Sequence, residues 1–269
     1  EETPEVLSSS FLKLDKALEK IPDAEKTTWT TALEKCPELC GESFKIMFLR
    51  CAHFDCDRAA ERVVAYWNKR LELFTPSKAF LPMILGADGA MKDDEKSLTA
   101  GLFRLVPKAD DAGHPIFFGD PTNMPVERDH PSMVRCFWYH IHAALDSEDG
   151  QKNGVVFISY PKNASFWQFD KKLMRAIVES IQGYLPVRMS AIHIVQPPTF
   201  FRIVYPIVKL LLGQKLKKRI NVHVGKQEKV LEKLEEAYRM PKQNLPTEIG
   251  GEVVLKQDEW LQGRKDAGL

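Results

Sequence analysis

The chain changes its hydrophobic pattern near residue 100, and this change restricts the folds open to it. Upstream, apolar residues recur at helical spacing, for example across residues 7–18 and 57–76. Downstream, short apolar runs that are typical of buried strands alternate with helical patterns. Strands that alternate with helices indicate βαβ crossovers and a mostly parallel sheet. We therefore predict an α/β protein, in which an N-terminal helical bundle precedes a mostly parallel sheet flanked by helices.

The individual elements can be placed from turn residues and periodicity. Asp57 is expected to cap the last N-terminal helix, and residues 77–94, which contain Pro and Gly, are typical of a linker. A turn at 110–113 should join the first two strands into a hairpin, and residues 146–153 are predicted to be a polar loop. The expected strands are 101–107, 115–118, 154–160, 191–195 and 220–224, and the expected later helices are 131–145, 164–182, 199–212 and 226–237.

Composition excludes several classes of protein. The 38 basic and 37 acidic residues leave a net charge of +1, which disfavours a general nucleic-acid binder. No apolar run reaches the roughly 18–20 residues that a membrane-spanning helix needs. The N-terminus lacks the basic and apolar regions of a signal peptide, and it also lacks a starting Met, as a trimmed chain would. Five irregularly spaced cysteines indicate reduced thiols in a cytoplasmic protein, with no metal site expected.

Catalytic fingerprints are missing from the sequence. It contains no Gly-rich dinucleotide motif, no phosphate-binding loop and no nucleophile elbow. His140 and His142 project about 200° apart on a predicted helix, so they cannot share a metal. The acidic triplet 93–95 precedes a helical pattern and is expected to complement that helix N-terminus. We therefore predict a protein that is not an enzyme.

Four segments carry a specific pattern. They are Phe-Leu-Arg-Cys-Ala-His-Phe-Asp at 48–55, the segment 185–198 with Ile-His-Ile before Gln-Pro-Pro, the basic segment 216–225, and Leu-Pro-Thr-Glu-Ile-Gly-Gly-Glu at 245–252. Together, in this order and spacing, they resemble the CRAL-TRIO family of lipid-binding proteins. The resemblance covers roughly residues 40–252. It is strongest to the animal branch typified by α-tocopherol transfer protein and cellular retinaldehyde-binding protein.

This resemblance implies an architecture and a function. It implies an N-terminal helical domain at 1–76 and a lipid-binding domain at 93–269, in which a movable helix gates a hydrophobic cavity. The implied protein carries a hydrophobic ligand between membranes, for example a tocopherol-, retinoid- or carotenoid-like terpenoid or a phospholipid, without a cofactor. A lipid-sensing or protein-interaction module of a signalling regulator is the alternative.

The segment 199–212 matches the gate of that family. Its apolar residues cover more than one helical face, so the helix is either buried in the core or meets lipid on its outer side. Pro206 would kink this helix near its middle. The expected ligand-binding residues are Phe137, Trp138, Ile141, Phe157, Ile158, Phe166, Trp167, Ile192, Ile194, Phe200, Phe201, Val204, Ile207, Val208 and Leu211.

A basic cluster follows the gate, and a cation beside an anionic membrane surface contributes about 1 kcal/mol to docking. The resemblance assigns positions matching Arg188, Lys215 and Arg219 to a groove for phosphoinositide headgroups. The expected phosphoinositide and membrane residues are Arg188, Lys215, Lys217, Lys218 and Arg219. The alternative is an ordinary solvated surface.

Three departures from the family change particular expectations. Ala52 and Ser190 occupy further positions of the groove that are basic in the family, so the groove is depleted. Val187 stands where yeast phosphatidylinositol transfer proteins have a glutamate, so phosphatidylinositol is not expected inside the cavity in the manner of those proteins. Ser159 with Tyr160 stand where the family often has an aspartate, so the polarity of the pocket is expected to differ from that of both branches.

Overall fold

The computed structural model describes residues 2–269, and their first third forms the predicted helical bundle. Asp55 rather than Asp57 caps the long fourth helix, because its carboxylate oxygen accepts the Arg58 amide at 3.1 Å. That helix is interrupted at Thr75, whose φ of 64° lies outside the helical region immediately before Pro76. The four helices are α1 (Pro4–Lys20), α2 (Asp23–Lys35), α3 (Glu42–Cys51) and α4 (Cys56–Lys78).

The rest of the chain builds a five-stranded sheet in the order β1-β2-β3-β4-β5. The first pair is the predicted antiparallel hairpin, and the remaining pairs are parallel, so the mostly parallel α/β prediction is confirmed. The strands are β1 (Phe103–Leu105), β2 (Ile116–Gly119), β3 (Val155–Ser159), β4 (Met189–Val195) and β5 (Ile220–His223).

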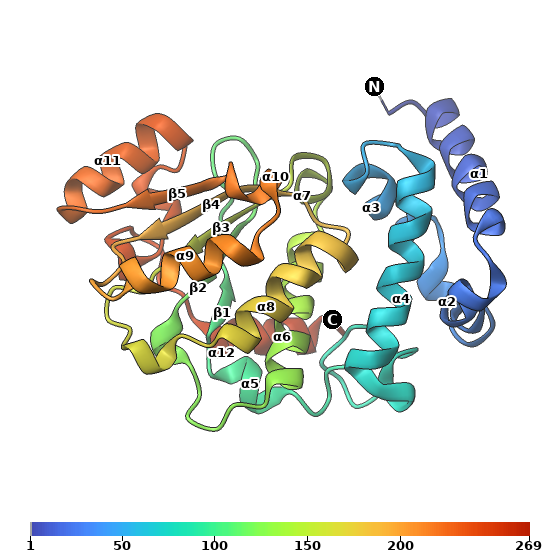
Figure 1. The fold of residues 1–269 in the computed structure, drawn as a ribbon, viewed down its shortest axis with the longest axis horizontal. Coiled ribbons are helices and arrows are strands. Elements are labelled where there is room, and N and C mark those ends of the chain that lie inside the picture. Colours follow the sequence, from blue (N-terminus) through green and yellow to red (C-terminus); the bar gives the residue numbers. More distant parts are fainter. Residues whose placement is uncertain (1) are drawn as a thin grey trace.

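Each parallel connection moves one step along the sheet in the same direction. Right-handed crossovers therefore place the connecting helices on one face of the sheet, where Figure 1 shows them. The connecting helices are α6 (His130–Ala144), α7 (Glu148–Asn153), α8 (Lys171–Glu179), α9 (Phe201–Leu211) and α10 (Gln214–Lys217). The opposite face is covered by α11 (Gln227–Tyr238), which buries Val230 and Leu234 against the sheet, and by the segment 240–255.

Three details differ from the sequence prediction. The expected polar loop 146–153 contains α7, because the Ser147 hydroxyl caps it by accepting the Gly150 amide at 3.1 Å. The expected helix 164–182 is shorter: α8 ends at Glu179 and a π-helical turn at 180–184 follows. The helices α5 (Glu95–Thr99) and α12 (Gln257–Asp266) also belong to the fold, and α12 was not predicted.

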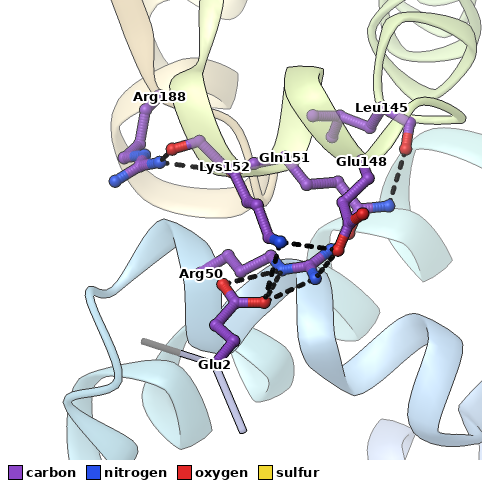
Figure 2. A network of polar contacts seen from close by, with 7 residues as sticks. All are labelled: Glu2, Arg50, Leu145, Glu148, Gln151, Lys152 and Arg188. Carbon is purple, nitrogen blue, oxygen red and sulfur yellow. Dashed lines mark hydrogen bonds and ion pairs between the residues drawn. The ribbon is translucent and has the colours of Figure 1, made fainter.

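One hydrophobic core extends from the N-terminal helices to the crossover face of the sheet. The α4 side chains Tyr66 and Phe74 both pack against Trp138 of α6. A polar network adds to this junction, because Arg50 of α3 binds both Glu2 and Glu148 (Figure 2). The proposed domain boundaries, 1–76 and 93–269, stay predictions.

Candidate functional site: an apolar cavity beneath α9

A cavity of about 160 Å³ lies between the crossover face of the sheet and the helices α8 and α9. Its walls are almost entirely apolar side chains. The strands supply Phe103, Gly119, Phe157, Ser159, Ile192, Ile194 and Ile220; α8 and the turn after it supply Leu173, Met174, Ile177, Val178 and Ile181. The gate region supplies Phe200, Phe201, Val204, Val208, Leu212 and Leu216; and the segments between these elements supply Leu102, Pro121, Met124, Pro161, Ala164, Ser165, Gln168, Phe169 and Asp170.

The alternation of side chains along each strand decides which residues reach the cavity. Phe157 and Ser159 of β3 line it, whereas Ile158 between them is fully buried in the core of the opposite face. In β4, Ile192 and Ile194 line the cavity and the intervening His193 faces the other side. Alternate residues of β3 and β4 therefore line the cavity on one face of the sheet and pack into the core on the other face.

The gate candidate α9 carries apolar side chains on both its inner and its outer side. Val204 and Val208, one helical turn apart, are buried and line the cavity. Ile203 and Leu210 point outward and are 64% and 83% exposed. The outer side of α9 is therefore mixed, because the exposed cations Arg202 and Lys209 lie on it together with these two apolar side chains. Pro206 lies within the helix, as expected from the sequence.

The expected ligand-binding residues divide into two groups. Those that line the cavity are Phe157, Ile192, Ile194, Phe200, Phe201, Val204 and Val208, and those that lie outside its lining are Phe137, Trp138, Ile141, Ile158, Phe166, Trp167, Ile207 and Leu211. The inner stripe of α6 is used for packing rather than for the cavity. Phe137 contacts the rings of Phe103 and Phe117, and the Trp138 indole donates to Ser180 Oγ at 2.9 Å.

Sequence reasoning missed the wall that α8 provides. Leu173, Met174, Ile177 and Val178 recur at helical spacing and form one continuous apolar face toward the cavity. This periodicity is visible in the sequence. The periodicity did not show that this helix lines a cavity, because an amphipathic helix over a filled core has the same pattern.

An exposed aromatic pair extends the rim of the cavity. Trp167 is 82% exposed and Phe166 is 48% exposed, and the Phe166 ring lies edge-on to Phe200 with centroids 5.8 Å apart. Large exposed apolar side chains that adjoin one another are typical of a surface that contacts membrane or protein.

The basic residues near the gate differ in how much of their hydrogen-bonding capacity is engaged within the protein. Arg188 donates hydrogen bonds to the backbone oxygens of Gln151 and Lys152 in α7 (Figure 2). Its Nη1 also lies 3.0 Å from the His53 ring. Arg219 donates one guanidinium N–H to the Met189 carbonyl. Two of the expected headgroup residues thus have part of their hydrogen-bonding capacity engaged within the protein.

The lysines of the cluster are better placed for an external anion. Lys215 and Lys218 are exposed and Lys217 is half-buried, at and beside the short helix α10. The helix α10 ends at Lys217, so Lys218 and Arg219 follow it. The pKa of His53 is lowered by burial and then by Arg188, Arg58, Lys215 and Arg219, which shows that these cations gather around it.

Comparison with known protein families agrees with this fold, in which a helix covers an apolar cavity. Residues 101–251 match the family model described as the CRAL/TRIO domain. The chain belongs to this family. The resemblance seen in the sequence motifs is thereby confirmed, and the CRAL/TRIO match contains all five strands and the cavity.

Curated relatives of this CRAL/TRIO chain carry different names. The mouse tyrosine-protein phosphatase non-receptor type 9 is 25% identical over 91% of this chain and 40% of its own length. The human alpha-tocopherol transfer protein-like is 26% identical over 78% of this chain and 58% of its own, and human clavesin-2 is 28% identical over 78% and 62%. The chain therefore spans about two fifths to three fifths of these relatives.

A solved structure supports the fold. The crystal structure of Sfh5 superposes with a TM-score of 0.51 at 13% identity, covering 95% of this chain and 97% of that chain. Among residues 2–269, no helix combines the length and hydropathy needed to cross a bilayer. The same residues contain no group of three or more His, Cys, Asp or Glu side chains arranged to hold a metal ion.

Proposed function

We propose that this CRAL/TRIO chain is a non-enzymatic carrier that binds a hydrophobic molecule and exchanges it with membranes. The observation that carries the proposal is the apolar cavity beneath α9, a helix that also exposes Ile203 and Leu210 on its outer side. Burying a methylene contributes about 0.8 kcal/mol, so a chain of ~12–16 carbons gains on the order of 10 kcal/mol. Transfer of the same chain from water into a bilayer is favourable by a similar free energy. The ligand can therefore exchange between the protein and the membrane.

Long ligands require movement of the gate. A cavity of about 160 Å³ is comparable to one that holds a molecule the size of benzene. Uptake of a terpenoid or a long acyl chain therefore requires α9 to move outward. The Gln182 side chain holds the end of α9 by accepting the Gly213 amide at 2.5 Å and donating to the Leu211 carbonyl at 3.5 Å.

The carrier proposal is tested by filling the cavity. Ile194→Trp places a large ring in the void from the floor of the sheet, and we expect loss of binding of retinol, measured by fluorescence without vesicles. Overpacking costs about 1–3 kcal/mol of stability, so a thermal melt must confirm that the variant is folded. The control is Val126→Trp, which adds the same ring at a fully exposed position. Failure of the unchanged protein to take up any of a panel of retinoids, tocopherols and phospholipids would refute the proposal.

Membrane docking is proposed to combine apolar and basic groups. Trp167, Ile203 and Leu210 are exposed around the gate, and the lysines follow directly after it. This arrangement supports peripheral binding to anionic, including phosphoinositide-containing, cytoplasmic membrane surfaces.

Replacing Lys215, Lys217 and Lys218 with Ala should weaken binding to phosphatidylserine vesicles ~100-fold, at about 1 kcal/mol per lysine. Cosedimentation at two salt concentrations measures the effect, which salt should diminish. The matched control replaces Lys226, Lys229 and Lys233 of the α11 region. Equal losses in both triple variants would mean that net charge, and not the position beside the gate, governs docking.

A signalling module is the second candidate function, supported by the match of 91% of this chain to 40% of a tyrosine-protein phosphatase. In this case the same cavity would report the presence of lipid to an attached domain. The length of the encoding gene distinguishes the two, because a fused catalytic domain favours the module.

A further inference from the structure

Three polar side chains away from the cavity form a row of hydrogen bonds at the edge of the sheet where the parallel strands begin. Asp110 and His114 belong to the connection between β1 and β2, and Ser190 is the second residue of β4. Asp110 Oδ2 lies 2.8 Å from His114 Nδ1, and Nε2 of the same ring lies 3.0 Å from Ser190 Oγ. None of the three lines the cavity beneath α9. The fold therefore brings together a carboxylate, an imidazole and a hydroxyl, the last two from positions 76 residues apart.

Asp110 fixes the orientation of the His114 ring. Its side chain is 2% exposed, and its other oxygen, Oδ1, accepts the backbone amides of Ala112 at 3.0 Å and His114 at 2.8 Å. These bonds hold the carboxylate within the turn and leave Oδ2 for the imidazole. Because a carboxylate only accepts hydrogen bonds, Nδ1 of the neutral imidazole carries the proton and Nε2 becomes the acceptor. The Ser190 hydroxyl then donates to Nε2, which is the arrangement that a general base requires.

A β-bulge directs Ser190 toward the imidazole. Met189 and Ala191 pair with consecutive residues of β3, so Ser190 between them is the extra residue of the bulge. A bulge takes one residue out of the regular ladder and re-aims its side chain. Ser190 is half-buried and the His114 side chain is 19% exposed, so a small electrophile can approach the hydroxyl oxygen from solvent.

The two separations fall within the range in which a base activates a nucleophile. A nucleophile and its base must lie within about 2.6–3.2 Å of each other, and a third group must orient the base. The 3.0 Å between Ser190 and His114 and the 2.8 Å between His114 and Asp110 both meet this condition. An isolated serine hydroxyl is a weak nucleophile, whereas one with these partners reacts with acyl donors.

We propose that Ser190 is an acylation site that takes its acyl group from a thioester. The hydroxyl oxygen attacks the thioester carbonyl, and its proton passes to Nε2 of His114. The C–S bond then breaks, the thiolate leaves with that proton as a free thiol, and the acyl group remains on Ser190 as an ester. Asp110 is a positioning residue, because it acts through the imidazole. The product is an acylated chain, so this inference goes beyond the carrier proposal, adds a modification site to it and requires no turnover.

The test treats the full chain with S-phenyl thioacetate at about pH 8, where an ordinary imidazole is neutral. We expect intact mass spectrometry to show the gain of an acetyl group, and peptide mapping to place it on Ser190. Ser190→Ala should lose this adduct, whereas Ser9→Ala, at an exposed position of α1, should retain it. Acetyl groups found only on lysines or cysteines, or no acetylation at all, would overturn the proposal and leave the carrier proposal intact.

Two variants assign the roles, and thermal melts check that both are folded. His114→Gln removes the base, so the rate of Ser190 acetylation should fall ~100-fold. Asp110→Asn keeps an oxygen for the two backbone amides, but its NH2 group donates to Nδ1, so the ring proton moves to Nε2 and the rate should fall ~100-fold or more. NMR of the ¹⁵N-labelled chain should detect this change of tautomer. An unchanged rate in either folded variant, or a proton that stays on Nδ1 in Asp110→Asn, would overturn the assignment.

Discussion

Lowering the pH from 7.5 to 5 should reduce the free energy of unfolding by about 6–8 kcal/mol, because four histidines have pKa values held well below 6.5. Burial, followed by Arg70, lowers the pKa of His142 to about 3. Burial lowers the pKa of His140 to about 4, although the Cys136 carbonyl at 2.8 Å partly opposes the shift. Burial, followed by the neighbouring His223, lowers the pKa of His193 to about 3, and burial lowers that of His223 to about 4. Since total stabilities are about 5–15 kcal/mol, the protein should be close to unfolding at pH 5.

The sign follows from proton uptake by the unfolded chain. Each folded-state pKa lies below the ordinary value of 6.5, so the unfolded chain binds protons first as the pH falls. The stabilisation is fully present above pH 6.5 and is lost between there and the folded pKa values, at about 1.4 kcal/mol per pH unit for each histidine. His193 and His223 share a hydrogen bond of 2.9 Å and titrate as a pair, which gives the lower end of the estimate.

Urea titrations at pH 7.5, 6.5, 6 and 5 measure this effect above the range in which most carboxylates titrate. His140→Gln should flatten the pH dependence by about one histidine's share, 1.4 kcal/mol per pH unit. His53→Gln, at an exposed position, should change it much less. A free energy of unfolding that stays constant from pH 7 to 5 would show that the imidazoles are not buried as described.

Removing either partner of the Asp94–Arg135 ion pair should cost about 3–5 kcal/mol, because the other charge is left buried and unpaired. Asp94 is fully buried, and Arg135 binds it through Nε at 2.9 Å and Nη2 at 2.7 Å. Arg135 also donates to the Leu73 carbonyl of α4 at 3.2 Å. The pair therefore joins the N-terminal helices, the linker and α6 at one point.

Three variants separate the charge from the packing. Asp94→Ala and Arg135→Met should each destabilise strongly in urea unfolding. The double variant Asp94→Leu/Arg135→Met should recover most of the loss, because apolar replacement of a whole buried pair is often neutral. The exposed pair Lys96–Glu127 is the control, and its loss should cost far less, because solvent screens both charges. Additive losses in the double variant would contradict the pairing.

Local sequence signals predicted most elements but not their partners. The acidic triplet 93–95 was expected to serve a helix N-terminus, and Asp94 does precede α5. Its carboxylate nevertheless binds Arg135, 41 positions away, which no local pattern reveals. In the same way, His193 and His223 were recognised as strand residues, while their mutual hydrogen bond depends on the pairing of β4 with β5.

The sequence alone determined the succession of helices and strands, the apolar character of the gate segment and the presence of the family motifs. These features depend on residues within a few positions of one another. Only the tertiary structure decided which face of each strand meets the void, and that α8 closes it while α6 packs solidly. A void is the space left between elements distant in sequence, and the same apolar pattern serves equally well for a filled interior.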